Sequence, residues 1–194
     1  MKTVNNLFGC LMVLFFINAC TPASILGTGA GSAMVIAEGD RSMGAVIDDA
    51  TIKVNVAAKF ISSEDNLFVD VSTTILNGRV LLTGLVDSQE IRIDAVRRVW
   101  EVEGVQEVIN EIQIGNRSGV KEYANDLWIN TQAKALAAKT VGLRVAGYNF
   151  ETIKGVVYIA GITSRPEQLE DLINAVKTIK GVKEIVNYVV IKDN

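Results

Sequence analysis

GRVLLTG at residues 78–84 and GVVYIAG at residues 155–161 are two versions of one pattern, a short apolar run with a glycine at each end. Shifting the sequence on itself by 77 residues aligns these stretches and extends the match, without a gap, from Asp49 to Ile114 of the first copy. Self-similarity at a fixed period is the signature of a repeated structural unit. Two tandem copies of one small domain are the economical explanation.

Each copy has the same expected order of secondary structure. A helix comes first, because apolar residues recur at spacings of three and four, as in Ile129, Ala133 and Leu136. Asp49 and Asp126, near the start of this helix, are expected to cap it or to oppose its dipole. A hairpin, a second helix and a last strand follow, which gives the order αββαβ. We therefore predict an α+β fold with two domains, each a three-stranded mixed sheet covered on one face by two helices.

Six glycines recur as pairs in the two copies, and we expect all six to be structural. Each copy has one in the hairpin turn, one at the end of a strand and one just past the second helix, where a left-handed conformation or a close backbone approach favours glycine. The pairs are Gly78 and Gly155, Gly84 and Gly161, and Gly104 and Gly181.

The N-terminus has the pattern of a bacterial lipoprotein signal. Lys2 precedes an apolar run, residues 7–17, that is too short to span a bilayer. The stretch INAC at residues 17–20 resembles a lipobox, in which the cysteine becomes the acylated, palmitate-carrying first residue of the mature chain. Thr21 stands where lipoproteins retained in the inner membrane commonly carry Asp, which favours the outer membrane by analogy. An ordinary secretory signal that leaves Cys20 as a free thiol is the alternative.

These features divide the chain into five segments. We expect a lipoprotein signal peptide at 1–19, a lipidated N-terminus and flexible tether at 20–46, a first domain at 47–114, a linker at 115–124 and a second domain at 125–191.

Composition argues against catalysis and metal binding. The chain has no histidine, and its two cysteines are Cys10 and Cys20, so the expected domains lack the commonest general base and any thiolate ligand. The net charge is only −3, and no long basic patch suggests nucleic-acid binding. We expect no catalytic residue, no metal site and no cofactor.

The hairpin pattern and the endings GVQEVIN (104–110) and GVKEIVN (181–187) resemble the BON domain of bacterial envelope proteins. Two in-register copies after a lipobox, with DRSMG at 40–44 and NDLWI at 125–129, resemble the dual-BON outer-membrane lipoproteins. The resemblance implies a lipid-anchored protein that faces the periplasm, binds phospholipid and supports envelope integrity without catalysis.

Charge and one tryptophan point to the second copy as the lipid-binding one. Residues 47–114 contain six Lys and Arg against twelve Asp and Glu, a net charge of −6, whereas residues 125–191 contain eight against six, a net charge of +2. Simple divergence of two surfaces would explain this equally well. Trp128 lies on the flank of the helical core stripe, and its counterpart in the first copy is Thr51, so the fold does not require an indole there.

The sequence therefore predicts a contact with anionic phospholipid along the first helix of the second domain. The candidate residues are Leu127, Trp128, Gln132, Ala135 and Lys139. Two alternatives stay open: that Trp128 packs between the two domains, and that the protein is a lipid-anchored adaptor whose helix faces dock another envelope protein.

Overall fold

The computed structural model describes residues 42–115 and 119–192, which contain both copies of the repeat. The expected signal peptide, Cys20 and nearly all of the expected tether lie outside the described residues.

The first copy contains three helices and three strands. They are α3 (Met43–Ile61), α4 (Leu67–Asp70), β1 (Val71–Leu76), β2 (Arg79–Val86), α5 (Gln89–Trp100) and β3 (Glu107–Ile114). The second copy repeats this plan, with a 3₁₀ segment in place of α4. Its elements are α6 (Val120–Val141), η2 (Gly142–Gly147), β4 (Tyr148–Ile153), β5 (Val156–Thr163), α7 (Pro166–Lys177) and β6 (Glu184–Ile191).

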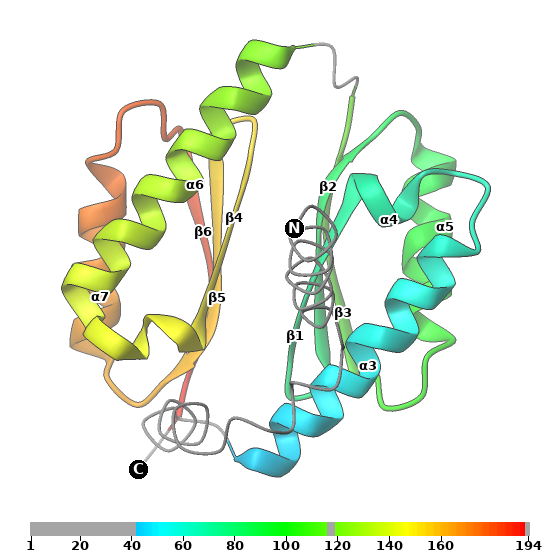
Figure 1. The fold of residues 1–194 in the computed structure, drawn as a ribbon, viewed down its shortest axis with the longest axis horizontal. Coiled ribbons are helices and arrows are strands. Elements are labelled where there is room, and N and C mark those ends of the chain that lie inside the picture. Colours follow the sequence, from blue (N-terminus) through cyan, green and yellow to red (C-terminus); the bar gives the residue numbers. More distant parts are fainter. Residues whose placement is uncertain (1–41, 116–118, 193–194) are drawn as a thin grey trace, which may run out of the picture. The chain divides into compact units, whose positions relative to one another are not determined.

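Both sheets have the mixed topology that the sequence predicts. The central strand β2 pairs antiparallel with β1 and parallel with β3, and β5 pairs in the same way with β4 and β6. In each copy the two long helices cover the same face of the sheet (Figure 1). The prediction of an αββαβ unit with a helix-covered sheet is confirmed. The short segments α4 and η2 were not predicted, because so few residues carry no detectable period.

Each copy has its own hydrophobic core between its helices and its sheet. The first core is built around side chains that are completely shielded from solvent, namely Val56, Leu67, Val80, Leu82, Ala95 and Val99. The second is built around Ile129, Ala133, Ala137, Val157, Ile159, Leu172 and Val176. Each of these two cores is built from residues of one copy.

Both first helices begin earlier than the sequence predicts. α3 begins at Met43, within the expected tether, and α6 begins at Val120, within the expected linker. The hydroxyl of Ser42 accepts a hydrogen bond from the backbone N–H of Ala45 at 3.2 Å and so caps α3. The added turns lie before the first buried residue of each helix, so the core-facing periodicity does not reveal them.

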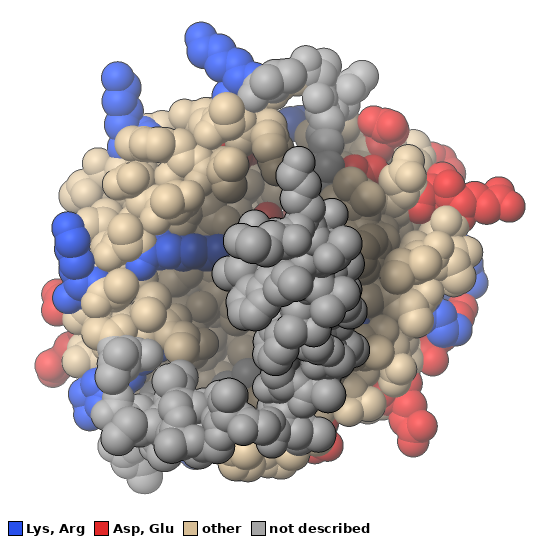
Figure 2. Space-filling model, viewed as in Figure 1, with Lys and Arg blue, Asp and Glu red and all other residues tan. Residues whose placement is uncertain are grey.

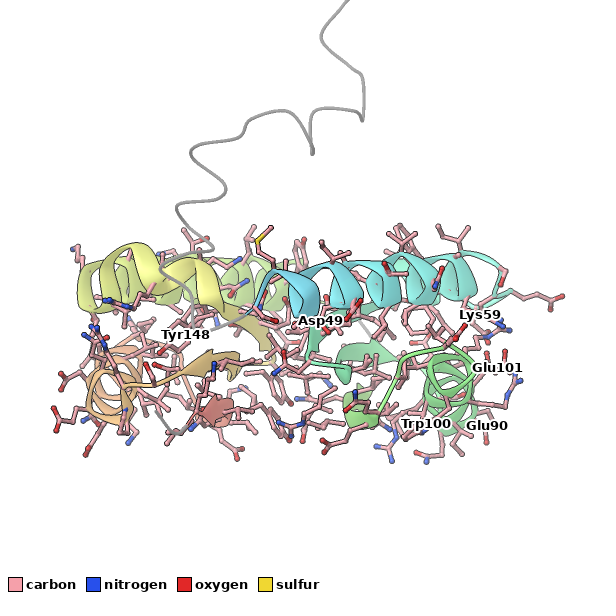
Figure 3. The ribbon with its side chains drawn as sticks, turned by 90° about the horizontal axis from the view of Figure 1, so that it is seen from below. Asp49, Lys59, Glu90, Trp100, Glu101 and Tyr148 are labelled. Atoms are coloured by element: carbon pink, nitrogen blue, oxygen red, sulfur yellow. The ribbon has the colours of Figure 1, made fainter. Side chains whose placement is uncertain are left out.

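Asp49 and Asp126 do not cap their own helices, which corrects the expectation from the sequence. Asp49 lies on the side of α3 that faces the sheet (Figure 3) and is only 5% exposed. Its two carboxylate oxygens accept hydrogen bonds from the backbone N–H groups of Asn77 and Gly78, both at 2.8 Å. These hydrogen bonds connect the first helix to the hairpin turn of its own sheet. The second copy repeats the arrangement.

The hairpin turn is the same in the two copies. Asp126 accepts from the N–H groups of Lys154 at 2.7 Å and Gly155 at 2.8 Å. The first turn residue has a positive φ in both copies, 53° at Asn77 and 52° at Lys154, and the glycine that follows also has a positive φ. Two successive residues with positive φ make the type I′ geometry that matches the twist of a two-residue hairpin.

Gly84 and Gly161 lie inside strands β2 and β5. The sequence pattern had placed them at the strand ends. They pair with Val71 and Tyr148, where the neighbouring strands β1 and β4 begin. A Cβ at Gly84 would lie 2.2 Å from the backbone oxygen of Asp70, and one at Gly161 would lie 2.7 Å from that of Gly147. The backbone that leads into β1 or β4 passes too close to the glycine to leave room for a side chain. Gly104 and Gly181 follow the second helices, with φ of 90° and 99°.

Candidate functional site

The helix α6 places its residues on two opposed faces. Ile129, Ala133 and Ala137 are fully buried, and Leu136 is partly buried against the same core. This agrees with the stripe expected from the sequence and adds Ala137 to it. At about 100° per residue, the side chains about 180° away from Ile129 must face solvent. The exposed face of α6 is thus fixed by the core.

Most of the candidate lipid-binding residues lie on this exposed face. Trp128 is 46% exposed and Leu127 is 56% exposed, and Ala135 and Lys139 are also exposed. Trp128, Ala135 and Lys139 fall within about 40° of one another around the helix axis, whereas Leu127 lies about 100° from Trp128. Gln132 is half-buried at the edge of the face. Trp128, Ala135 and Lys139 therefore form one strip, with Leu127 across the face from it.

Three further residues of the exposed face of α6 were not among the candidates. Tyr123 is 65% exposed and lies on the same side of the helix as Leu127. Lys121 and Lys134 are also exposed. Lys121 and Tyr123 were missed because they lie in the segment expected to be a linker. The signal that could have found them is the four-residue step from Tyr123 to Leu127, which continues the helix toward its N-terminus.

The charges on the exposed face of α6 are all positive. Lys121, Lys134 and Lys139 project from it, while the two acidic residues of α6, Glu122 and Asp126, lie within about 60° of the buried Ile129. Figure 2 shows lysine and arginine side chains over the α6 side of the second domain, and aspartate and glutamate side chains gathered over the α4 and α5 side of the first. An exposed indole, a tyrosine and three lysines suit an anionic, partly apolar surface.

The acidic residues of the first domain are arranged as surface ion pairs. Lys59 Nζ lies 2.7 Å from Glu101 Oε2, and the two side chains meet between α3 and the end of α5 (Figure 3). Arg97 contacts Glu101 at 3.0 Å and also contacts Asp94. Partial burial of Asp94 acts to raise its pKa, but hydrogen bonds from Arg98 and Arg97 outweigh it and lower the pKa. The hydrogen bond from Lys59 lowers the pKa of Glu101.

Lowered carboxyl pKa values are the opposite of what a general acid needs at neutral pH. A surface depression of about 450 Å³ lies beside the hairpin turn of the first domain and includes Asp48, Asp49 and Glu103 in its lining. Both oxygens of Asp49 already accept backbone N–H groups there. Within residues 42–115 and 119–192, no cluster of three or more His, Cys, Asp or Glu side chains is placed to hold a metal ion.

Two copies of an αββαβ unit, with a carboxylate-held hairpin in each, define the class of this protein. The family model of the BON domain matches residues 48–116 and 125–193, so the chain belongs to the BON domain family and contains two BON domains.

Three curated relatives cover most of the chain. The outer membrane lipoprotein DolP of Haemophilus influenzae is 27% identical over 173 residues, which is 88% of this chain and 88% of that protein. Osmotically-inducible protein Y of Escherichia coli is 30% identical over 149 residues, 75% of this chain and 73% of that protein. A protein from the gshII 5′ region of Anaplasma centrale is 36% identical over 147 residues, 75% of this chain and 96% of that protein. The resemblance of the sequence to dual-BON proteins of the DolP type is confirmed.

Among the described helices, none combines the length and the apolar character that a membrane-spanning helix requires.

Proposed function

We propose that this protein is an outer-membrane lipoprotein that faces the periplasm and whose second BON domain binds anionic phospholipid through the exposed face of α6. The observation that carries the proposal is the exposure of Trp128, 46%, on a helix face with three lysines and no carboxylate. An indole favours the boundary between headgroups and acyl chains because its ring is apolar and its N–H is polar.

Lysine side chains extend this contact to charged headgroups. Lys139 lies on the same side of α6 as Trp128, and Lys121 and Lys134 flank it. Each basic residue near an anionic bilayer surface contributes on the order of 1 kcal/mol, and its aliphatic stem can lie along apolar surface while the ammonium group reaches the headgroups. Three lysines and one indole together are sufficient for reversible binding of a tethered domain.

The anchor itself is proposed at Cys20. Acylation there, with palmitate among the chains, attaches the protein to the outer membrane, since each buried CH₂ contributes about 0.8 kcal/mol and two or three chains hold firmly. The name of the Haemophilus relative, an outer membrane lipoprotein, supports this assignment. We propose that the protein serves the integrity of the envelope by binding and not by catalysis.

A second candidate function is an adaptor that docks another envelope protein. The same exposure of Tyr123, Leu127 and Trp128 supports it, because aromatic side chains with neighbouring cations are also common at protein interfaces. Flotation of the unacylated chain with liposomes separates the two functions. A lipid-binding protein floats with anionic vesicles, whereas an adaptor stays behind.

The direct test replaces Trp128 by Ala in the unacylated chain and measures binding to vesicles that contain an anionic phospholipid. We expect binding to weaken by about 1–3 kcal/mol, the range for losing one large apolar contact. Trp100→Ala is the matched control, because Trp100 is exposed to a similar degree, 53%, and ends α5 of the first domain (Figure 3).

Thermal melts accompany the titrations. The melting temperature of the Trp128→Ala variant should stay near that of the wild type, because Ile129, Ala133 and Ala137 keep the core. Binding equal to wild type would place the lipid site elsewhere. Early unfolding would instead support a packed, structural Trp128.

A further inference from the structure

The helix α3 carries a second apolar stripe on the side that faces away from its own core. We call it the α3 seam, and it consists of Met43, Ile47, Ala50, Val54, Ala57 and Ile61. Its four large members are among the most exposed hydrophobic side chains of the described residues: Met43 at 53%, Ile47 at 60%, Val54 at 68% and Ile61 at 64%. The buried side of α3, with Ile52, Val56 and Phe60, lies opposite.

The residues of the α3 seam alternate in steps of four and three along the entire helix. These are the a and d positions of a heptad repeat, with β-branched Ile47, Val54 and Ile61 at a and the smaller Ala50 and Ala57 at d. A step of 3.5 residues keeps a stripe facing one partner helix, and β-branched residues at a favour two-stranded pairing. Alanine at d allows the two backbones to approach closely.

The fold does not require this seam, because the duplicated domain lacks it. Shifting by 77 residues places Thr131 at the position of Val54 and Lys134 at that of Ala57. α6 keeps the same buried face, but it has a polar residue and a charged residue on its exposed face. The α3 seam is therefore a property of the first domain alone, separate from the core that both domains share.

The charges around the α3 seam fit a second copy of the same helix. Within about 80° of its centre, the only charged residue on α3 is Lys53. In an antiparallel pair the two Lys53 side chains approach each other, whereas in a parallel pair Lys53 of one copy lies beside Ala58 of the other. Parallel pairing brings the same a positions together without opposing like charges.

A bilayer is the less suitable occupant of the α3 seam. The seam contains no aromatic residue and one flanking lysine, unlike α6, and it belongs to a domain with a net charge of −6. The seam is about 28 Å long and about 10 Å wide, so each copy covers on the order of 300 Å² of helix surface, well below a standard permanent interface. An area of this size suits a reversible dimer.

We infer that two copies of this protein associate in parallel through the α3 seam to form a reversible dimer. The inference does not rest on lipid binding by α6, and it makes the opposite prediction for salt. Salt screens the repulsion between two domains of net charge −6 and strengthens the dimer, whereas salt weakens the attraction of lysines to anionic lipid.

Sedimentation of the chain from residue 20 on, with Cys20→Ser to prevent acylation, tests the dimer. This chain contains every described residue and both cores. From about 10 µM to about 1 mM the wild-type mass should rise from monomer toward dimer. Val54→Glu should weaken association at least about tenfold, because each dimer would bury two facing carboxylates. Asn55→Glu, which adds the same charge outside the seam, should dimerise like the wild type.

Disulfide formation tests the parallel orientation, because this chain has no other cysteine. Ile47→Cys should oxidise to a covalent dimer faster than Asn55→Cys, since residue 47 meets its own counterpart only in a parallel pair. A wild type that stays monomeric throughout, equal association of the two Glu variants, or loss of association in both overturns the inference. A monomeric wild type whose Val54→Glu variant alone loses binding to neutral vesicles assigns the seam to lipid.

Discussion

Replacing Asp49 by Asn should destabilise the first domain far more than its small chemical change suggests. Asp49 is 5% exposed, and each of its carboxylate oxygens accepts a backbone N–H at 2.8 Å, from Asn77 and Gly78. An asparagine side chain offers one oxygen and turns its NH₂ group toward the other N–H. The variant loses one charge-assisted hydrogen bond and leaves a buried donor without an acceptor.

The cost follows from these two losses. A hydrogen bond to a charged group contributes about 1.5–3 kcal/mol, and an unsatisfied buried donor costs about 1–3 kcal/mol, so with partial relaxation we expect a loss of about 2–4 kcal/mol. For a domain of this size, each kcal/mol lowers the melting temperature by about 4–8 °C. Asp48→Asn, at the exposed neighbouring position, is the control and should change stability by less than about 0.5 kcal/mol.

Two measurements check the prediction for Asp49→Asn. Guanidinium unfolding followed by circular dichroism gives the free energy of unfolding, and hydrogen exchange gives the protection of the Asn77 and Gly78 amides. Exchange at these two amides should accelerate in Asp49→Asn and not in Asp48→Asn. If the two variants unfold alike, or if the two amides stay protected, then the carboxylate does not hold the turn.

Three further predictions concern glycine packing, the anchor and pH. In thermal melts, Gly84→Val should destabilise the first domain by about 3 kcal/mol and Gly161→Val the second by about 1–3 kcal/mol, because a Cβ would meet a backbone oxygen at 2.2 Å and 2.7 Å, respectively. The control Gly44→Ala, which has open space around it, should be neutral or stabilising, and unchanged melting of both Val variants would contradict the packing. Cys20→Ser should abolish acylation and leave precursor or unanchored protein, as seen by fractionation and mass spectrometry, and normal sorting of this variant would exclude the lipobox. The pKa of Asp94 is lower in the folded than in the unfolded protein, so its contribution to stability is complete above the unfolded value near 4 and is lost as the pH falls below it. Asp94→Asn should therefore flatten the acid limb of a stability profile measured from pH 2 to pH 6. An unchanged acid limb would assign the acid sensitivity to other groups.

The repeat and the apolar periods were sufficient to predict the fold. GRVLLTG and GVVYIAG fixed the central strands and their turns, and the stripe at Ile129 and Ala133 fixed the buried face of α6. What the periods could not reveal were residues that contact nothing of the core. The first turns of α3 and α6 are of this kind, as is the exposed Tyr123.

Side-chain roles were harder to predict than elements. Asp49 and Asp126 stand near the start of a helix, where a carboxylate commonly caps it, and only the sheet geometry shows that a turn 28 residues later is the partner. Gly84 was expected at a strand end because it closes the apolar run GRVLLTG, but the parallel pairing of β2 with β3 carries the strand on to Val86. Both differences arise from tertiary contacts, which local sequence patterns do not encode.

The carboxylate of each first helix also changes what the hairpin tip needs from its own sequence. A type I′ turn ordinarily depends on Asn or Gly at its first position, and the second domain has Lys154 there at a φ of 52°. Because Asp126 fixes both N–H groups from outside, the geometry of the tip is stored in a distant helix, and the tip residue is free to change its chemistry. The hairpin tip of the first domain has the neutral amide of Asn77, and that of the second has the ammonium group of Lys154. This position therefore offers a site for retuning surface charge without redesigning the loop.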